Sequence, residues 1–387
     1  MKIKLEFPKN FLWGSGSSAN QVEGGIENCD WAEYARMGKL PSVDEFTPDH
    51  YHRFKEDFDL AKSLGHNSHR FSIEWARIEP EEGKFDLNEI EHYRKVLLAL
   101  KDRGITPLVT LWHFTLPLWF SHRGGFEHQN APAVFARYCA FVADQLKDLC
   151  EIVATINEPV VFANNGYIRG FWPPFKKNPF AFMRTVKNLI RGHNLAYTEI
   201  KKLAPHLNVG VVKDNIHFTS NKNPFNIILK KFCHWFWNHY FLDRTHKKCD
   251  HIGLNYYFHT HFGPSLGFPK NDMGWNIDAE GIYHMLVDLK RYNLPLYVTE
   301  AGIPDRTDEK RGGYIKQLVN WTHRAIVDGA DIRGFMYWSL TDNYELAHGY
   351  TQEFGLIHID HATRARIIRP SALVYKTICE SNALTIE

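Results

Sequence analysis

The feature that most constrains the fold of this chain is the alternation, eight times over, of a short apolar run with a stretch of helical periodicity. The runs are rich in β-branched and aromatic residues, as buried strands are. Strands that alternate with helices pair in parallel through crossover helices, and eight such units can close into a barrel. We therefore expect strands at Phe11–Ser17, Asn67–Ile73, Thr106–Trp112, Ile152–Glu158, Asn208–Lys213, His251–Tyr256, Leu296–Glu300 and Gly334–Ser339.

The stretches between the runs carry apolar residues on one helical face. No Gly/Ser-rich linker, low-complexity tract or change of composition divides the 387 residues. Length alone would allow two or three domains, but α/β barrels also reach this size as one domain. We expect an α/β protein that forms a single (β/α)8 TIM barrel over residues 1–387. The clearest apolar faces are Phe54, Phe58, Ala61 and Leu64; Ile90, Val96, Leu97 and Leu100; and Leu318, Trp321, Ala325 and Ile326.

The composition excludes several classes of function. A formal net charge of +2 is too balanced for an electrostatic nucleic-acid binder, and no apolar run reaches the roughly 18 residues of a membrane span. The six cysteines form no CxxC pair, so we expect free thiols in a reducing compartment. Residues 1–10 lack the apolar segment of a signal peptide. These features predict a cytoplasmic protein with no nucleic-acid or membrane partner and no cofactor.

Two of the expected strands end on a carboxylate, at Glu158 and at Glu300. A carboxylate at the end of a buried strand is costly to desolvate unless it has a partner or a task. For either residue alone, a salt-bridged strand end is an equally good interpretation. Two such residues on different strands indicate a pair for acid, base or nucleophile chemistry.

Other polar and aromatic residues also fall where strands end. A barrel places its chemistry at the carboxyl ends of its strands. For a lone histidine such as His113 the alternative is a core imidazole, and most of the 11 tryptophans must be core residues, with site roles considered only for Trp338 and Trp112. The candidate site residues at strand ends are Gln21, His113, Asn157, Asn255, Tyr257 and Trp338.

Strand periodicity also places a charge inside the barrel. With a period of two, Arg70 lies on the face opposite the apolar residues that suit the helix layer. A buried guanidinium needs a carboxylate, and we expect Glu300, with Glu74 at the rim as the alternative. Asn157 and Glu158 are neighbours and should face opposite ways, so both reach one pocket only if the strand end bulges.

Two histidine pairs resemble metal ligands, but neither belongs to an HExxH motif. His66 and His69 lie on opposite faces of their strand, and His259 and His261 form the second pair. We expect structural or solvated roles for all four and no metal site.

In these motifs the chain resembles glycoside hydrolase family 1, the retaining β-glycosidases, over nearly its whole length. Any one of the matching motifs alone would be weak evidence for the family, but together they follow the family order and lie at strand ends. The motifs are Phe11–Gly14, HRFSIEWARIEP (His69–Pro80), TLWHFTLPLWF (Thr110–Phe120), TINEP (Thr155–Pro159), IGLNYY (Ile252–Tyr257), YVTEAG (Tyr297–Gly302), YWSLTDNYELAHGY (Tyr337–Tyr350) and Phe354–Leu356.

The resemblance implies that Glu158 is the general acid/base and Glu300 the nucleophile. Retaining hydrolysis needs the two carboxyl groups about 5–5.5 Å apart. Arg70, Asn255 and Tyr257 would support the ionised nucleophile, whose charge raises the pKa of Glu158.

The same resemblance implies how the sugar is held. Asn157 would contact the 2-hydroxyl, and Trp338 would offer a flat apolar face beneath the ring. Gln21, His113 and Glu345, with Tyr257, would line the rest of the sugar site. A carboxylate at Glu345 would repel a 6-phosphate, so we expect a non-phosphorylated, glucose- or galactose-like sugar.

The chain departs from the family pattern in several places. Leu346 replaces a usual tryptophan, which leaves the preferred sugar and the rate open. The connection between Asp243 and Asp250 is short, so we expect shortened βα loops and a shallow, open aglycone site. The aromatic stretch Phe232–Tyr240 is expected to pack as a helix, and an exposed self-association face, hence a homo-oligomer, is the alternative.

We therefore expect a retaining exo-β-glycosidase whose partners are small carbohydrates or aryl glycosides. Two alternative functions remain: a transglycosylating β-glycosidase, and a catalytically weak sugar-binding protein on the same fold. The presence of both Glu158 and Glu300 weighs against the last of these.

Overall fold

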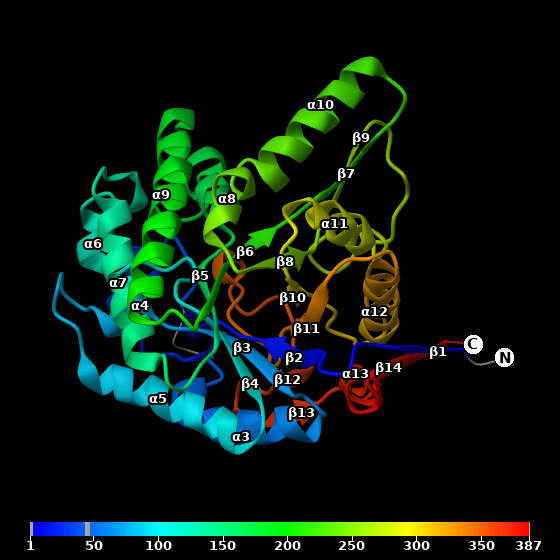
Figure 1. Ribbon diagram of the computed structural model, residues 1–387, viewed down its shortest axis with the longest axis horizontal. Helices are drawn as coiled ribbons and strands as arrows, with labels where there is room; N and C mark the ends of the chain where they lie inside the picture. The colour runs from blue at the N-terminus through cyan, green and yellow to red at the C-terminus, as the bar shows by residue number, and fades with distance from the viewer. Residues whose placement is uncertain (1–2, 43–46, 387) are drawn as a thin grey trace.

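A closed barrel of eight parallel strands forms the centre of the computed structural model, which describes residues 3–42 and 47–386 (Figure 1). Around the barrel the strand order is β10-β11-β2-β3-β4-β5-β6-β8. Every expected strand is present, which confirms the predicted TIM barrel. The strands are β2 (Leu12–Gly16), β3 (Ser68–Ser72), β4 (Thr106–Thr110), β5 (Ile152–Asn157), β6 (Asn208–Asp214), β8 (His251–Tyr256), β10 (Leu296–Ala301) and β11 (Ile332–Trp338).

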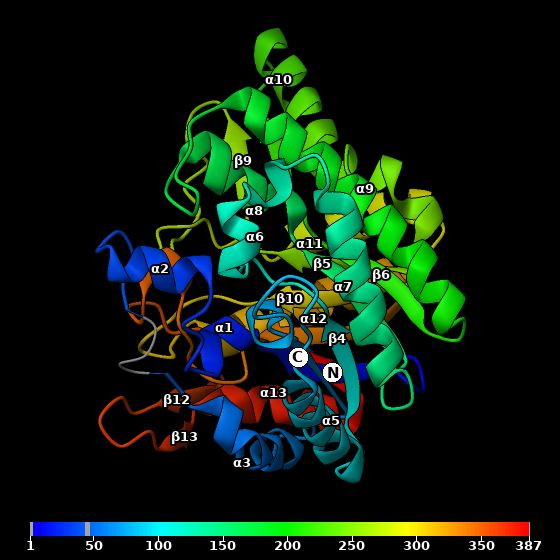
Figure 2. The ribbon, with the colours of Figure 1, turned by 90° about the vertical axis from the view of Figure 1, so that its left-hand side faces the viewer.

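Helices cover the outer face of the barrel (Figures 1 and 2). Their apolar faces are buried as the periodicity predicted, and Phe58 and Ala61 are wholly inaccessible. Side-chain caps fix several helix starts: Asn178 Oδ1 accepts hydrogen bonds from the backbone N–H groups of Phe180 and Ala181. The covering helices are α3 (His50–Ser63), α5 (Leu87–Asp102), α7 (Ala131–Leu146), α9 (Pro179–Leu203), α11 (Gly281–Leu289), α12 (Arg311–Val327) and α13 (Pro370–Ser381).

Shorter elements lie outside this plan, and the strands among them were not predicted. Parallel pairing joins β7 (His217–Ser220) to β9 (His259–Phe262). The antiparallel pairs are β1 (Ile3–Glu6) with β14 (Ala383–Ile386), and β12 (Ile357–Ile359) with β13 (Arg366–Ile368). The remaining α-helices are α1 (Ala19–Val22), α2 (Asp30–Arg36), α4 (Trp75–Ile78), α6 (Leu118–His122), α8 (Pro159–Asn164) and α10 (Pro224–His234). Short 3-10 or π turns cover Gly125–Glu127, Asn165–Arg169, Trp235–His239, Leu242–Arg244, His246–Lys248, Lys290–Tyr292 and Leu346–His348.

Helix α10 projects from the barrel together with β7 and β9, against which it packs (Figure 1). Only part of the aromatic stretch 232–240 is packed as expected. Asn238 and His239 are buried, whereas Phe232 and Trp235 are exposed on the same side as Phe225. The stretch is therefore divided between a packed face and a solvent face.

The structure bears on the thiols and on the length of the apolar helices. All six cysteines are unpaired, and Cys233 alone among them is partly exposed. Within residues 3–42 and 47–386, none of the helices combines the length and the apolar character needed to cross a bilayer.

A buried ion cluster ties α3 to the small sheet near the C-terminus. Asp57 Oδ2 lies 2.7 Å from His50 Nδ1, and Asp57 Oδ1 accepts a 2.8 Å hydrogen bond from Arg366 Nε. All three side chains are almost inaccessible. Burial raises the pKa of Asp57, but the bonds from His50 and Arg366 outweigh it and hold the pKa below its usual range.

Replacing Asp57 by Asn should lower the free energy of unfolding by about 3–5 kcal/mol, because Arg366 would remain buried without a negative partner. Asp59→Asn on the same helix is the matched control. It loses only an exposed pair with Arg103 and should cost at most about 1 kcal/mol. Equilibrium urea unfolding at neutral pH measures both losses, and equal losses would contradict the role of the cluster. Since the pKa of Asp57 is lowered on folding, the difference should shrink as the pH falls through the folded value.

Candidate active site

A cavity of about 410 Å³ opens at the carboxyl ends of the barrel strands. Most of the predicted site residues line it, and they come from the segments that follow different strands. Arg70, Asn157 and Asn255 lie behind this surface and are fully buried. The predicted residues in the lining are Gln21, His113, Glu158, Tyr257, Glu300, Trp338 and Glu345, and Leu346 lies beside them.

The backbone at the end of β5 lets two neighbouring side chains serve the same region. The pairing of β5 with β6 shifts register between Ala154 and Asn157, which is the irregularity that the sequence required. Glu158 follows in a left-handed conformation (φ 45°, ψ 60°) and Pro159 starts α8. A non-glycine residue in this region costs about 1–3 kcal/mol and persists only where its surroundings fix it. The turn directs Glu158 into the cavity while Asn157 stays beneath it.

Glu300 has a hydrogen-bond donor on each carboxylate oxygen. Arg70 Nη1 forms an ion pair with Oε1, and the Tyr257 hydroxyl donates a 2.8 Å hydrogen bond to Oε2. Strand periodicity predicted this partner for Arg70. The alternative partner, Glu74, instead accepts a 2.8 Å hydrogen bond from Thr115 Oγ1. Two donors, one of them permanently charged, stabilise the negative charge of Glu300.

A chain of hydrogen bonds links the two glutamates beneath the cavity. Arg70 Nη2 donates to Asn157 Oδ1 at 2.7 Å. Asn255 Nδ2 donates to the same oxygen at 3.2 Å and to Glu158 Oε1 at 2.8 Å. The order along the chain is therefore Glu300, Arg70, Asn157, Asn255 and Glu158. Because each member is buried, the carboxyl groups are held in one fixed relative arrangement.

Glu158 lies in surroundings that favour its protonated form. Burial raises its pKa well above the usual value, and the negative charges of Asp214 and Glu300 raise it further. The sequence predicted the direction of this shift from Glu300 alone. Burial and Asp214 contribute more, so the glutamate pair is only part of the cause.

Asp214 and its neighbour Lys213 act electrostatically on Glu158, and the sequence did not predict either of them. They end β6, are inaccessible to solvent, and Asp214 Oδ2 accepts a 3.1 Å hydrogen bond from Trp237 Nε1. Burial raises the pKa of Asp214 to about 6 and lowers that of Lys213 to about 8. The rule that charged residues at strand ends belong to the site would have identified both residues, had it been applied to β6.

At the far end of the cavity Glu345 is held by Gln21. Gln21 Nε2 donates to the carbonyl oxygen of Tyr344 at 2.9 Å and lies 3.4 Å from Glu345 Oε2. Burial raises the pKa of Glu345 to about 8, and the negative charge of Glu300 adds to this effect. Below that pH Glu345 is a neutral acid that can donate as well as accept a hydrogen bond. The repulsion of a phosphate expected from this residue is therefore weak at neutral pH.

His113 and Trp338 present parallel rings, with centroids 5.9 Å apart and an interplanar angle of 12°. His113 Nε2 lies 3.3 Å from Asn157 Nδ2. Burial lowers the pKa of His113 well below its usual value, and the charge of Arg70 lowers it further. The imidazole is therefore neutral, and it adds hydrogen-bonding capacity to the cavity without adding charge.

Aromatic residues form a second wall of the cavity that the sequence did not predict. Its members lie on loops, where no strand or helix periodicity marks them. The site role considered for Trp112 was wrong: its ring packs in the core against Phe126 and Phe162, and its Nε1 donates to the carbonyl of Thr115. The wall consists of Phe171, Trp172, Phe258, Trp275 and Phe354.

Comparison with known proteins assigns the chain to a family. The model of glycosyl hydrolase family 1 matches residues 3–251 and 237–384. Beta-glucosidase A of Thermotoga maritima is 30% identical over an alignment of length 446, which covers 99% of this chain and 100% of the relative. A beta-galactosidase of Sulfolobus acidocaldarius is 31% identical over 484 residues, covering 99% of this chain and 97% of the relative.

Solved structures agree in fold over the same length. A beta-glycosidase from Pyrococcus horikoshii superposes with a TM-score of 0.93 at 36% identity, covering 99% of this chain and 96% of that one. The family 1 β-glucosidase from Thermotoga maritima superposes with a TM-score of 0.92 at 29% identity, covering 98% and 99% of the two chains. The chain belongs to glycosyl hydrolase family 1 and is a glycoside hydrolase.

Proposed function

We propose that this protein is a retaining exo-β-glycosidase that releases the non-reducing terminal sugar of small β-glycosides by double displacement. The observation that carries the proposal is the difference between two carboxyl groups in one cavity. Glu300 is paired with Arg70 and Tyr257, whereas burial and nearby negative charge raise the pKa of Glu158. One group suits nucleophilic attack and the other suits proton donation.

In the first step Glu300 attacks the anomeric carbon, and a covalent bond forms between that carbon and a carboxylate oxygen. The bond to the leaving-group oxygen breaks while Glu158 transfers its proton to that oxygen. The alcohol leaves, and Glu158 becomes a carboxylate. Asn255, which donates to Glu158 Oε1, stabilises the charge that Glu158 then carries.

In the second step Glu158 removes a proton from water, which attacks the anomeric carbon and releases Glu300. The ester at Glu300 carries no charge, so its contribution to the raised pKa of Glu158 is absent while the intermediate exists. Two inversions at one carbon give net retention.

The sugar is proposed to lie on Trp338 with its hydroxyls held by Gln21, His113, Glu345 and Asn157. Asn157 directs Oδ1 to Arg70 and lies with Nδ2 3.3 Å from His113 Nε2, so the second N–H of Nδ2 is the proposed donor to the 2-hydroxyl. The relatives are named beta-glucosidase and beta-galactosidase, which supports a glucose- or galactose-like sugar. We further propose that a single catalytic domain carries out the reaction. We place it in the cytoplasm, since all six thiols are free and free thiols are typical of a reducing compartment.

Transglycosylation is the second candidate, and the aromatic wall favours it. Rings such as Trp172 and Trp275 in the lining would hold an apolar leaving group or an acceptor alcohol by stacking. An acceptor bound there competes with water for the glycosyl enzyme. Product analysis with and without an added alcohol separates the two reactions.

Variants of the two glutamates test the assignment on nitrophenyl glycosides and on a disaccharide. We expect Glu300→Ala to be essentially inactive on both. Glu158→Ala should lose about 10²–10⁴-fold on the disaccharide, which needs an acid, retain more activity on nitrophenyl substrates, and recover with azide. The surface variant Asp59→Asn serves as the control. Full activity of either glutamate variant on the disaccharide would falsify the proposal.

The pH profile tests the electrostatic origin of the acid. Deprotonation of Glu158 sets the basic limb of kcat/KM, and Asp214 raises the pKa of Glu158. Asp214→Asn should therefore move the basic limb to lower pH. The change should appear only above about pH 6, where Asp214 is charged in the native enzyme. A basic limb that stays in place would remove Asp214 from the mechanism.

Discrimination against phosphorylated sugars should depend on pH. Glu345 gains its charge as the pH rises through about 8, so the preference of the wild type for a plain glycoside over its 6-phosphate should increase over that range. In Glu345→Gln the preference should be flat. Measurement of kcat/KM for both substrates from pH 7 to pH 9, above the pH at which the phosphate itself titrates, decides it, and faster cleavage of the phosphorylated substrate would refute the proposed sugar class.

A further inference from the structure

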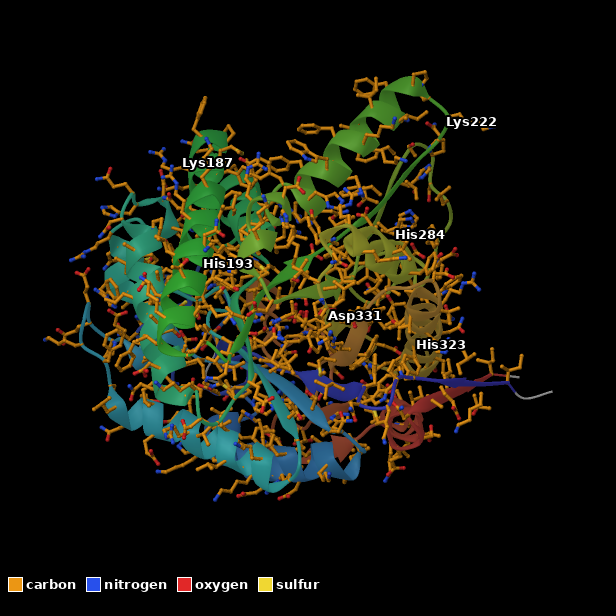
Figure 3. All side chains as sticks on the ribbon, in the orientation of Figure 1. Lys187, His193, Lys222, His284, His323 and Asp331 are labelled. Atoms are coloured by element: carbon orange, nitrogen blue, oxygen red, sulfur yellow. The ribbon has the colours of Figure 1, made fainter. Side chains whose placement is uncertain are left out.

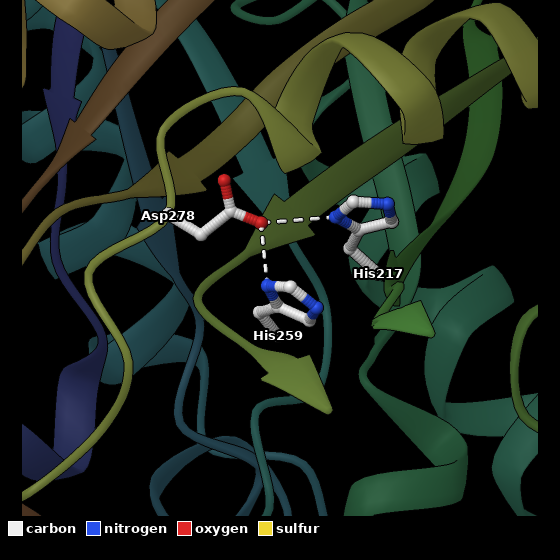
Figure 4. Close-up of side chains that lie close together, drawn as sticks. All are labelled: His217, His259 and Asp278. Carbon is white, nitrogen blue, oxygen red and sulfur yellow. Dashed lines mark hydrogen bonds and ion pairs between the residues drawn. The ribbon is translucent and has the colours of Figure 1, made fainter. Parts of the chain in front are cut away.

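Three side chains from separate segments converge where β7 and β9 leave the barrel (Figure 4). His217 begins β7, His259 begins β9, and the two are register partners in this small sheet. Asp278 lies just before α11. Its Oδ2 is 2.9 Å from the Nδ1 atoms of both histidines, and all three ligand atoms lie within 4.8 Å of one another. The sequence had paired His259 with His261 and had missed this cluster.

The contact between His259 and Asp278 is not a regular hydrogen bond. Within the described part of the chain, His259 Nδ1 is a buried atom with no hydrogen-bond partner, although Asp278 Oδ2 is 2.9 Å away. The side chains of both residues are almost inaccessible to solvent. A buried nitrogen that faces a carboxylate without a well-directed N–H requires an explanation.

The surrounding hydrogen bonds favour a lone pair on His259 Nδ1. His259 Nε2 lies 2.7 Å from Thr219 Oγ1, which in turn lies 2.8 Å from His261 Nδ1. If Nε2–H donates to Thr219, the Thr219 hydroxyl donates to His261 and the His259 Nδ1 lone pair points into the cluster. The opposite order would place a hydrogen on Nδ1, where Asp278 Oδ2, at 2.9 Å, is poorly aligned to accept it. Two lone-pair atoms at this distance repel each other unless a proton or a metal cation lies between them.

The carboxylate of Asp278 is also oriented through its other oxygen. The backbone N–H of Gly281 donates to Asp278 Oδ1 at 3.2 Å, and this leaves Oδ2 directed at the histidines. Partners of this kind, which orient a ligand through its far atom, accompany metal-binding histidines and carboxylates. His259 has such a partner in Thr219, and Asp278 has one in Gly281.

Two other clusters share some of these features, such as the buried Asp288 Oδ2 and the contact of His239 Nδ1 with Tyr292, but each already holds a proton or a cation between its ligand atoms. In the first, Asn238 Nδ2, oriented by the backbone of Ile216, lies 3.0 Å from His234 Nδ1. That contact makes Nδ1 the acceptor and places the proton of a neutral His234 on Nε2, the atom that faces His239 and Asp288.

In the second, the guanidinium of Arg369 already occupies the position of a cation. It donates to both oxygens of Asp342, at 2.8 and 2.9 Å, and to Glu353. The carboxylates of this cluster are therefore already neutralised.

We propose that His217, His259 and Asp278 bind a divalent transition-metal ion of the zinc class. Two imidazole nitrogens and one carboxylate oxygen suit such an ion, with water in a fourth position. Zinc–ligand bonds of about 2.0–2.2 Å place tetrahedral ligand atoms about 3.4 Å apart, so the ligands must separate slightly from their present contacts. His217, the most exposed of the three, is able to move.

The bound ion would brace one wall of the active site. Tyr257, which donates to Glu300, is two residues before His259. Trp275, which lines the cavity and packs against Tyr257 and Phe258, is three residues before Asp278. An ion between these segments would join the two barrel extensions to the start of α11. Its effect would be on the rigidity of the leaving-group wall and not on the chemical step.

The test starts from full-length protein stripped with a chelator and titrated with Zn²⁺ by calorimetry and with Co²⁺ by visible absorption. We expect one equivalent to bind to the wild type. His259→Gln and Asp278→Asn should weaken binding by at least about 100-fold, and Thr219→Val, which loses only the orienting hydroxyl, by about 10–100-fold.

Two control variants should keep wild-type affinity. His284→Gln removes a histidine of α11 that stacks on His217 at 4.7 Å but gives no ligand atom (Figure 3). His234→Gln removes a residue of the cluster around Asp288. Absence of a saturable equivalent in the wild type, unchanged affinity in His259→Gln, or loss in His234→Gln instead would overturn the proposal.

A measurement on the wild type alone keeps the test decisive if a variant does not fold. X-ray absorption at the zinc edge should show two imidazoles and a light-atom shell typical of carboxylate and water. A shell with one imidazole or none, or with sulfur, would overturn the site. Circular dichroism and glycosidase activity report folding of each variant independently of the metal.

Discussion

The active site depends on a guanidinium buried in the middle of the barrel. Arg70 is 1% exposed and cannot lose its proton under any ordinary condition. Leaving such a charge unpaired costs several kcal/mol, so Glu300 is required as a carboxylate by the stability of the fold. The same guanidinium orients Asn157, and through Asn157 and Asn255 it reaches Glu158. One buried cation thus pairs with one glutamate and, through two amides, fixes the position of the other.

The two glutamates show how a single cavity supports opposite chemistry. Both lie at strand ends and both line the cavity, yet their neighbours differ in charge. Glu300 faces a cation and a phenol, whereas Glu158 has an amide donor and lies near Asp214. Because burial strengthens every electrostatic interaction, these few contacts give the two carboxyl groups opposite surroundings, as the proposed mechanism requires.

The barrel and its central contacts could be predicted because they follow from period-two alternation. Alternation placed Arg70 inside, and the strand ends identified Glu158 and Glu300. It also required an irregularity before Glu158, without specifying the left-handed backbone that provides it. Features on connecting loops carry no such pattern. Trp275 and Asp278 come from one loop. The residues that they contact belong to other segments of the sequence and reach them only in the folded chain.

Closure of the barrel has a consequence for how the chain is made. Gly14 of β2 pairs with Ser68 of β3 on one side and with Met336 of β11 on the other. The second partner is synthesised more than three hundred residues later. Until then the nascent sheet keeps an unpaired edge, which is a template for association with other chains. Protection during translation therefore matters most for the amino-terminal strands, which wait longest for their neighbour.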